Sequence, residues 1–159
     1  MGVRRRAAAA RRRGRRAGLI LLHIVARGRI GRSPEAELVD RYLKRISWPT
    51  RVTELPDTGG KLPALELQTR RVLLDEKGAV LGSVELATLL GRWRDDGVRE
   101  ARFLIGAADG FDDAARADAD LLLSFGRATW PHLLARAMLA EQLFRSVSIL
   151  ANHPYHREG

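Results

Sequence analysis

The end of the chain is rich in side chains that can hold or move protons. Residues 152–158 read Asn-His-Pro-Tyr-His-Arg-Glu, and Pro154 stiffens the run. Tyr and His rings can stack on nucleic-acid bases, and an Arg guanidinium can fork onto phosphate. This composition favours a role at a nucleic-acid base over that of an inert terminus.

Three further segments place small or polar residues directly after expected strands. They are residues 73–78 (LLDEKG), 104–110 (LIGAADG) and 124–132 (SFGRATWPH). Ligands of open α/β sheets bind outside the carboxyl ends of strands, so the three segments can line one pocket. Arg127, His132 and Arg136 would add cationic or titratable groups at its rim. Taken singly, each of the first two is more often only a loop, and the third can be a helix entry with Trp130 in the core.

Other kinds of site find little support. The chain has no Cys, which excludes disulfides, thiolate metal sites and a cysteine nucleophile. The acidic stretch 109–120 lacks the spacing of a calcium loop, and His153 and His156 have no third ligand nearby. A serine-hydrolase elbow is absent, and Gly28-Arg29-Ile30-Gly31 is a weak match to a dinucleotide loop. We expect no metal.

Short apolar runs alternate with segments of helical period, which predicts a βαβ chain with a parallel sheet. We expect strands at residues 19–26, 51–55, 71–74, 102–105 and 121–125. Helices are expected at 34–46 with Ser33 as cap, at 84–95 with Ser83 as cap, at 112–119, and from Pro131 to about residue 150. The Pro- and Gly-rich residues 56–68 should form a loop.

The last predicted helix has the clearest period. Its apolar face includes Ala137, Ala140, Phe144 and Val147, with Leu139 and Leu143 beside them. Arg136, Glu141 and Arg145 fall outside this face. A face so broad at the end of a small chain predicts a homodimer.

Length and charge set the frame for these elements. The 159 residues (17.7 kDa) suit one domain, and no stretch is apolar enough to span a membrane. The net charge is +9, but residues 1–18 hold eight Arg and no acid, so removing them leaves +1 for residues 19–159. We expect the Arg-rich extension 1–18 to be disordered when free. It can be a phosphate-binding arm, a targeting leader or a dispensable extension.

Several motifs occur in a specific order along residues 19–159. They are Tyr42-Leu43-Lys44-Arg45; Leu74-Asp75 with Gly78; Leu104-Ile105-Gly106 with Gly110; Trp130-Pro131-His132 with Arg136; residues 140–145 (AEQLFR); and residues 152–158 (NHPYHRE). This series closely resembles the ribosomal RNA large subunit methyltransferase H family of the SPOUT superfamily, which methylates N3 of a pseudouridine in large-subunit (23S) rRNA.

The resemblance implies an α/β, SPOUT-type parallel-sheet fold with a C-terminal trefoil knot, in a homodimer that binds S-adenosyl-L-methionine. The cofactor contacts that it implies are Leu74, Gly106, Ala107, Phe125, Gly126, Arg127, Ala128, Thr129 and Trp130. The near-neutral charge of residues 19–159 favours the assembled ribosome as substrate, because few phosphate contacts leave recognition to shape. We expect a cytoplasmic protein, since a chain without Cys suits a reducing cytosol.

Roles at the RNA also follow from the resemblance. The tail would fold over the partner subunit's pocket, with Tyr155, His156 and Arg157 as the catalytic residues and Tyr155 and His156 positioning the base. RNA contacts would come from His132, Arg136, Arg145 and His153. Glu141 could accept a proton, but an i,i+4 pair with Arg145 is the expected role.

The chain departs from the family pattern in two places. Ala107 stands where the family has a second Gly, and its methyl group would crowd the cofactor unless its φ is negative. Residues 58–69 look shorter than usual and lack a helix, which affects the outer RNA-contacting surface. Two alternative functions remain: a SPOUT methyltransferase with another RNA target, and a non-enzymatic ribosome or RNA binder.

Overall fold

Five parallel strands form one sheet in the order β2-β1-β4-β3-β5. A computed structural model describes residues 19–107 and 110–157, so the Arg-rich extension expected at 1–18 lies outside the described residues. The strands are β1 (Leu21–Arg27), β2 (Thr50–Leu55), β3 (Thr69–Val80), β4 (Glu100–Ile105) and β5 (Leu121–Ser124), and the helices are α2 (Pro34–Leu43), α3 (Ser83–Asp95), α4 (Asp113–Asp118) and α5 (His132–Leu150). The predicted α/β parallel-sheet class is confirmed.

Most predicted elements appear within a few residues of their expected bounds, and two differ for local reasons. β3 does not end at Leu74 but continues to Val80, with its pairing to β5 shifted between Leu74 and Ala79. Gly78 permits this, because a Cβ there would lie 2.6 Å from the backbone of Leu122. α2 ends at Leu43, three residues before the expected Ile46.

The cap of α3 is also not the expected one. Gly82, and not Ser83, is the N-cap residue, and its N–H donates to Glu85 Oε1 at 3.0 Å. Ser83 instead donates its hydroxyl proton to Gln142 Oε1 at 2.7 Å, which links the start of α3 to the middle of α5. The hydroxyl that the sequence assigns to a local cap therefore makes a tertiary contact.

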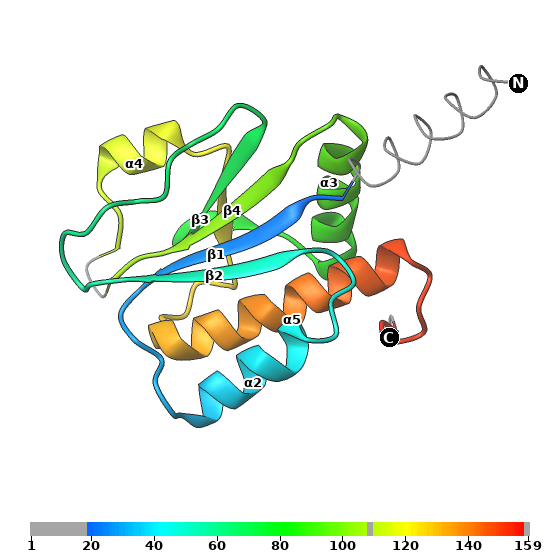
Figure 1. Cartoon of the computed structure of the whole chain (residues 1–159), viewed down its shortest axis with the longest axis horizontal. Helices are drawn as coiled ribbons and strands as arrows, with labels where there is room; N and C mark the ends of the chain where they lie inside the picture. Colours follow the sequence, from blue (N-terminus) through cyan, green and yellow to red (C-terminus); the bar gives the residue numbers. More distant parts are fainter. Residues whose placement is uncertain (1–18, 108–109, 158–159) are drawn as a thin grey trace, which may run out of the picture.

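The apolar core lies on one face of the sheet. Leu22 and Ile24 of β1 and Phe103 of β4 are almost fully buried, as are Leu139 and Leu143 of α5. Figure 1 shows α5 running beneath the sheet beside α2, and α5 contacts α3 as well. The apolar face of α5 is therefore largely buried within its own chain.

The opposite face is more polar and is closed by residues 56–68, which form the expected loop. Arg102 is 3% exposed and donates to Glu100 Oε2 and to the carbonyl oxygens of Pro63 and Ala64. Burial lowers the pKa of His23, which lies beside Glu100 on this face. Arg102 of β4 thus holds the loop in place through hydrogen bonds to the backbone of the loop.

Within the part of the chain that the structure describes, no helix is both long enough and apolar enough to cross a bilayer.

Candidate active site

A cavity of about 820 Å³ opens where β3, β4 and β5 approach their carboxyl ends. The three segments singled out in the sequence meet here, so the prediction of one shared pocket is confirmed. The lining includes Leu74, Asp75, Glu76 and Lys77 from β3; Ile105, Gly106, Ala107, Gly110 and Phe111 after β4; and Phe125, Gly126, Ala128, Thr129, Trp130, Pro131 and His132 before and into α5.

Most residues expected at the cofactor line this cavity. Leu74, Gly106, Ala107, Phe125, Gly126, Ala128, Thr129 and Trp130 are among its walls, whereas Arg127 is not. Trp130 is 42% exposed, which rules out the alternative placement of its ring in the core. A large aromatic ring is therefore available at the rim of the cavity.

Glycines and small residues give the cavity its shape. A Cβ on Gly106 would lie 3.3 Å from the ring of Phe111 and 3.4 Å from the carbonyl oxygen of Gly110, so a side chain there would enter occupied space. Gly126 has φ of 115°, a conformation that L residues rarely adopt. The φ of Ala107 is not positive. The backbone conformation in which its methyl group would crowd the cofactor is therefore not the one observed.

Polar side chains that the sequence analysis did not assign a role fix the β3 wall. Asp75 is 9% exposed; its Oδ2 accepts from Arg116 Nε at 2.7 Å and its Oδ1 from the N–H of Lys77 at 2.9 Å. Thr129 donates to Glu76 Oε2 at 3.2 Å, which joins the β3 wall to the segment before α5. The sequence signal that could have identified Asp75 and Glu76 as wall residues is their position immediately after Leu74.

Of the four residues expected to contact RNA, His132 lines the cavity and is exposed. Arg136 is not at the rim, which corrects that expectation: it is 1% exposed. Its Nη1 donates to Glu54 Oε2 at 2.6 Å, and its Nη2 donates to the carbonyl oxygen of Gly28 at 3.1 Å. These hydrogen bonds join α5 to β2 and to the end of β1. They also make the buried guanidinium of Arg136 unavailable to phosphate.

The pKa of Glu54 reflects this pairing. Burial by itself raises the pKa of the carboxyl, but the hydrogen bond from Arg136, the N–H of Ile30 and the charge of Arg136 outweigh burial and leave the pKa below its usual value. Glu54 is therefore held as a carboxylate beside the buried guanidinium.

Arg145 lies at a different place on α5, where it forms the expected i,i+4 pair with Glu141. Arg145 Nε and Nη2 donate to Glu141 Oε1 at 2.9 and 2.6 Å, and the hydroxyl of Tyr155 donates to the same oxygen at 3.0 Å. Arg145 Nη1 lies 3.0 Å from His156 Nδ1. We call Glu141, Arg145, Tyr155 and His156 the tail cluster.

The tail cluster changes the acidity of Tyr155. Burial raises the pKa of this phenol first, and the hydrogen bond to Glu141, the Glu141 charge and the neighbouring Tyr42 raise it further, to about 12. Tyr155 is therefore protonated near neutral pH and acts as a hydrogen-bond donor in this arrangement.

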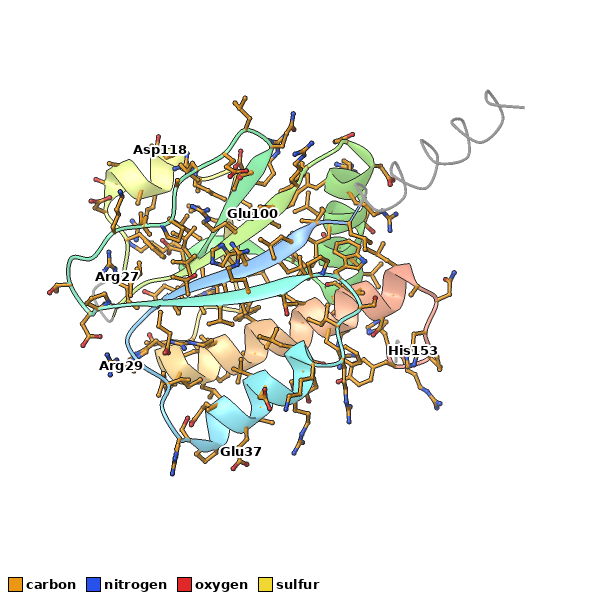
Figure 2. The ribbon with its side chains drawn as sticks, viewed as in Figure 1. Arg27, Arg29, Glu37, Glu100, Asp118 and His153 are labelled. Atoms are coloured by element: carbon orange, nitrogen blue, oxygen red, sulfur yellow. The ribbon has the colours of Figure 1, made fainter. Side chains whose placement is uncertain are left out.

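The tail lies outside the cavity of its own chain. It contacts α5 at Glu141, which lines a second cavity beside the first. None of the described tail residues lines the cavity. His153 and Arg157 are exposed beyond the cluster, and Figure 2 shows His153 at the end of the molecule where α5 finishes.

Among residues 19–107 and 110–157, no group of three or more His, Cys, Asp or Glu side chains is placed to hold a metal ion.

Comparison with known proteins places this geometry in a family context. A family model described as "Predicted SPOUT methyltransferase" matches residues 20–156. A protein of Rhizorhabdus wittichii named Ribosomal RNA large subunit methyltransferase H is 74% identical over 140 residues, which are 88% of this chain and all of that protein. Proteins with the same name from Novosphingobium aromaticivorans and Brucella anthropi are 69% and 42% identical, over 88% and 84% of this chain and 100% and 97% of their own lengths.

Proposed function

The chain belongs to the SPOUT methyltransferase family, and we propose that it is an rRNA methyltransferase that modifies N3 of a pseudouridine in large-subunit rRNA. The observation that carries the proposal is the 74% identity, over its full length, to a protein named for large-subunit rRNA methylation. The cavity supports the same proposal, because its walls come from the segments that the family resemblance assigns to cofactor binding.

We propose S-adenosyl-L-methionine as the methyl donor, and the cavity fits such a molecule. Leu74, Ile105 and Phe125 offer apolar surface to an adenine, and the absence of a side chain on Gly106 lets the segment after β4 pack closely in the cavity wall. Glu76 adds a carboxylate suited to a cationic ligand. When bound, this cofactor would supply a methyl group carried on a sulfonium sulfur.

The residues of the chain would align the reactants and assist loss of the N3 proton. Alignment of two reactants in line, together with a placed proton acceptor, accounts for most of the rate that such an enzyme needs. We assign Tyr155 and His156 to positioning the target base, and Arg157 and His132 to its oxygens or to phosphate. His153 and Arg145 remain candidate RNA contacts, whereas Arg136 is committed to Glu54.

We propose that two copies of residues 19–159, each a single catalytic domain, form a homodimer in which each tail serves the partner's cavity. The position of the tail supports this, because none of the described tail residues lines the cavity of its own chain. A second cavity of about 390 Å³ shares Leu123 and Phe125 with the first, and the exposed Val80 (65%) belongs to its wall. Apolar surface beside the site is suited to a subunit contact.

The family also implies a trefoil knot in the C-terminal half of the chain. The charge of +1 on residues 19–159 supports the assembled, cytoplasmic ribosome as substrate, since few phosphate contacts leave recognition to shape.

The test is methyl transfer by the purified full chain. Ribosomes, isolated large subunits and deproteinised rRNA from a strain without this activity would be incubated with labelled S-adenosyl-L-methionine, and the rRNA nucleosides analysed by mass spectrometry. We expect 3-methylpseudouridine, with the highest yield on ribosomes. A different methylated nucleoside would indicate another RNA target. RNA binding without binding of the cofactor would indicate a non-enzymatic binder.

A further inference from the structure

The tail is folded back along α5 and does not simply continue from it. Asn152, with φ of 56°, reverses the chain, and the N–H of His153 donates to the carbonyl oxygen of Ser148 at 2.8 Å. This reversal brings Tyr155 next to Glu141, fourteen residues earlier in the chain. The path of the tail therefore depends on contacts between side chains that are distant in sequence.

One carboxylate oxygen is the centre of those contacts. Oε1 of Glu141 accepts hydrogen bonds from Nε and Nη2 of Arg145 and from the hydroxyl of Tyr155. The aromatic ring of Tyr155 packs edge-on against Phe144, with ring centroids 4.6 Å apart, and under the Arg145 guanidinium at 4.9 Å. Hydrogen bonds to a charged acceptor are the stronger kind, so Glu141 fixes both partners at once.

Arg145 extends this arrangement to His156. Because a guanidinium can only donate, His156 Nδ1 must accept the hydrogen bond from Arg145 Nη1, and the proton of the neutral ring then lies on Nε2. His156 Nε2 is buried and has no partner among the described residues. The cluster thus sets the orientation of the imidazole.

The structure assigns Glu141 as the positioning residue for the tail: through Arg145 and Tyr155 it holds the tail in the conformation that serves methyl transfer. This inference rests on the proposed function. Glu141 acts through its partners and is not assigned a contact with substrate or cofactor. It is the only acidic residue of α5, so no neighbouring carboxylate on that helix can replace it.

The first measurement is independent of activity. The chain has two tyrosines, Tyr42 and Tyr155, so in a Tyr42→Phe background the near-ultraviolet tyrosinate signal reports Tyr155 alone. Tyr42 also raises the pKa of Tyr155, so the Tyr42→Phe chain itself is the reference, and we expect Glu141→Gln in that background to move the midpoint further down towards the ordinary value near 10. Glu37→Gln is the matched control, because Glu37 on α2 is exposed and its carboxylate makes no hydrogen bond or ion pair with the residues that the structure describes. The control should leave the midpoint unchanged.

The second measurement is steady-state methyl transfer on ribosomes by the same full-length variants with Tyr42 intact, alongside binding of labelled S-adenosyl-L-methionine. Glu141→Gln should lower kcat by roughly tenfold to a hundredfold, the scale expected for a small misplacement of reacting groups, and leave the Kd of the cofactor unchanged. Circular dichroism would check that the variant is folded.

The outcomes separate this inference from the proposed function. If the wild-type chain methylates no rRNA, the proposed function fails, while the tyrosinate titration still tests the cluster. An unchanged midpoint in Glu141→Gln would overturn the cluster as the holder of the tail. A lowered midpoint with unchanged kcat would overturn its role in catalysis, and a weakened Kd would show that Glu141 acts on the cofactor cavity instead.

Discussion

α5 carries two arginine–carboxylate pairs of the same chemistry and opposite context. Arg136 is 1% exposed, and its partner Glu54 lies on β2, eighty-two residues earlier in the chain. Arg145 retains 24% of its side-chain exposure, and its partner Glu141 is one helical turn away. The first pair joins the helix to the sheet, whereas the second organises a chain terminus. On the same helix, Arg136 therefore stabilises the fold and Arg145 organises the tail.

The difference between the pairs lies in what surrounds each charge. A buried guanidinium that loses its carboxylate is left without solvent, so breaking such a pair costs far more than breaking an exposed one. At the partly exposed Arg145, water can replace the lost contacts. Breaking this pair therefore changes mainly the orientation of Tyr155 and His156. The comparison predicts separate effects on stability and on rate.

The largest expected effect is on rate. Truncation before His153 should lower methyl transfer to ribosomes by ~10²-fold or more, because the tail holds the groups assigned to the target base. Binding of S-adenosyl-L-methionine, measured by equilibrium dialysis, should stay the same, since the walls of the cavity come from β3, the segment after β4 and the segment leading into α5. Loss of cofactor binding would make the tail a wall of the cavity, and full activity would remove it from the mechanism.

The next effect is on stability. Arg136→Met should lower the free energy of unfolding by roughly 2–3 kcal/mol, because it leaves the partly buried Glu54 carboxylate with only the N–H of Ile30 and the carbonyl of Gly28 without a side-chain donor. Glu54 is 34% exposed on its side chain, which places the value at the low end for a buried pair. Urea denaturation measures it. A change within experimental error would show that the Arg136–Glu54 pair does not stabilise the fold.

Particular residues show what the sequence could predict and where it stopped. The Glu141–Arg145 pair was predictable, because helical spacing alone brings its members together. The Glu54–Arg136 pair was not, because it depends on β2 lying beside β1 and on the end of β2 approaching the first turns of α5. The same limit explains Ser83, whose hydroxyl reaches Gln142 on another helix. The three cavity segments were predictable, since parallel strands bring their carboxyl ends to one edge.

A smaller effect concerns the pH dependence of the tail cluster. The folded-state pKa of Tyr155 is about 12, above the unfolded value near 10, so the unfolded chain loses this proton first as pH rises. The stabilisation is therefore complete below about pH 10 and is lost between about pH 10 and pH 12. Urea midpoints should fall more steeply over this window for the wild-type chain than for Tyr155→Phe. Parallel curves would place the phenol outside the cluster in solution.

The smallest effect is expected from Arg145→Met, the counterpart of Arg136→Met. An i,i+4 pair at a partly exposed site contributes about 0.3–0.5 kcal/mol, and the cation–π contact with Tyr155 adds about 0.5–1 kcal/mol. The loss on unfolding should therefore stay near 1 kcal/mol, below that of Arg136→Met, and should shrink further in high salt because solvent reaches this pair. Activity should respond in the opposite order, because only Arg145 orients His156. Equal losses of stability for the two variants would mean that burial does not separate the pairs, and the assignment of one to the fold and the other to the tail would then be wrong.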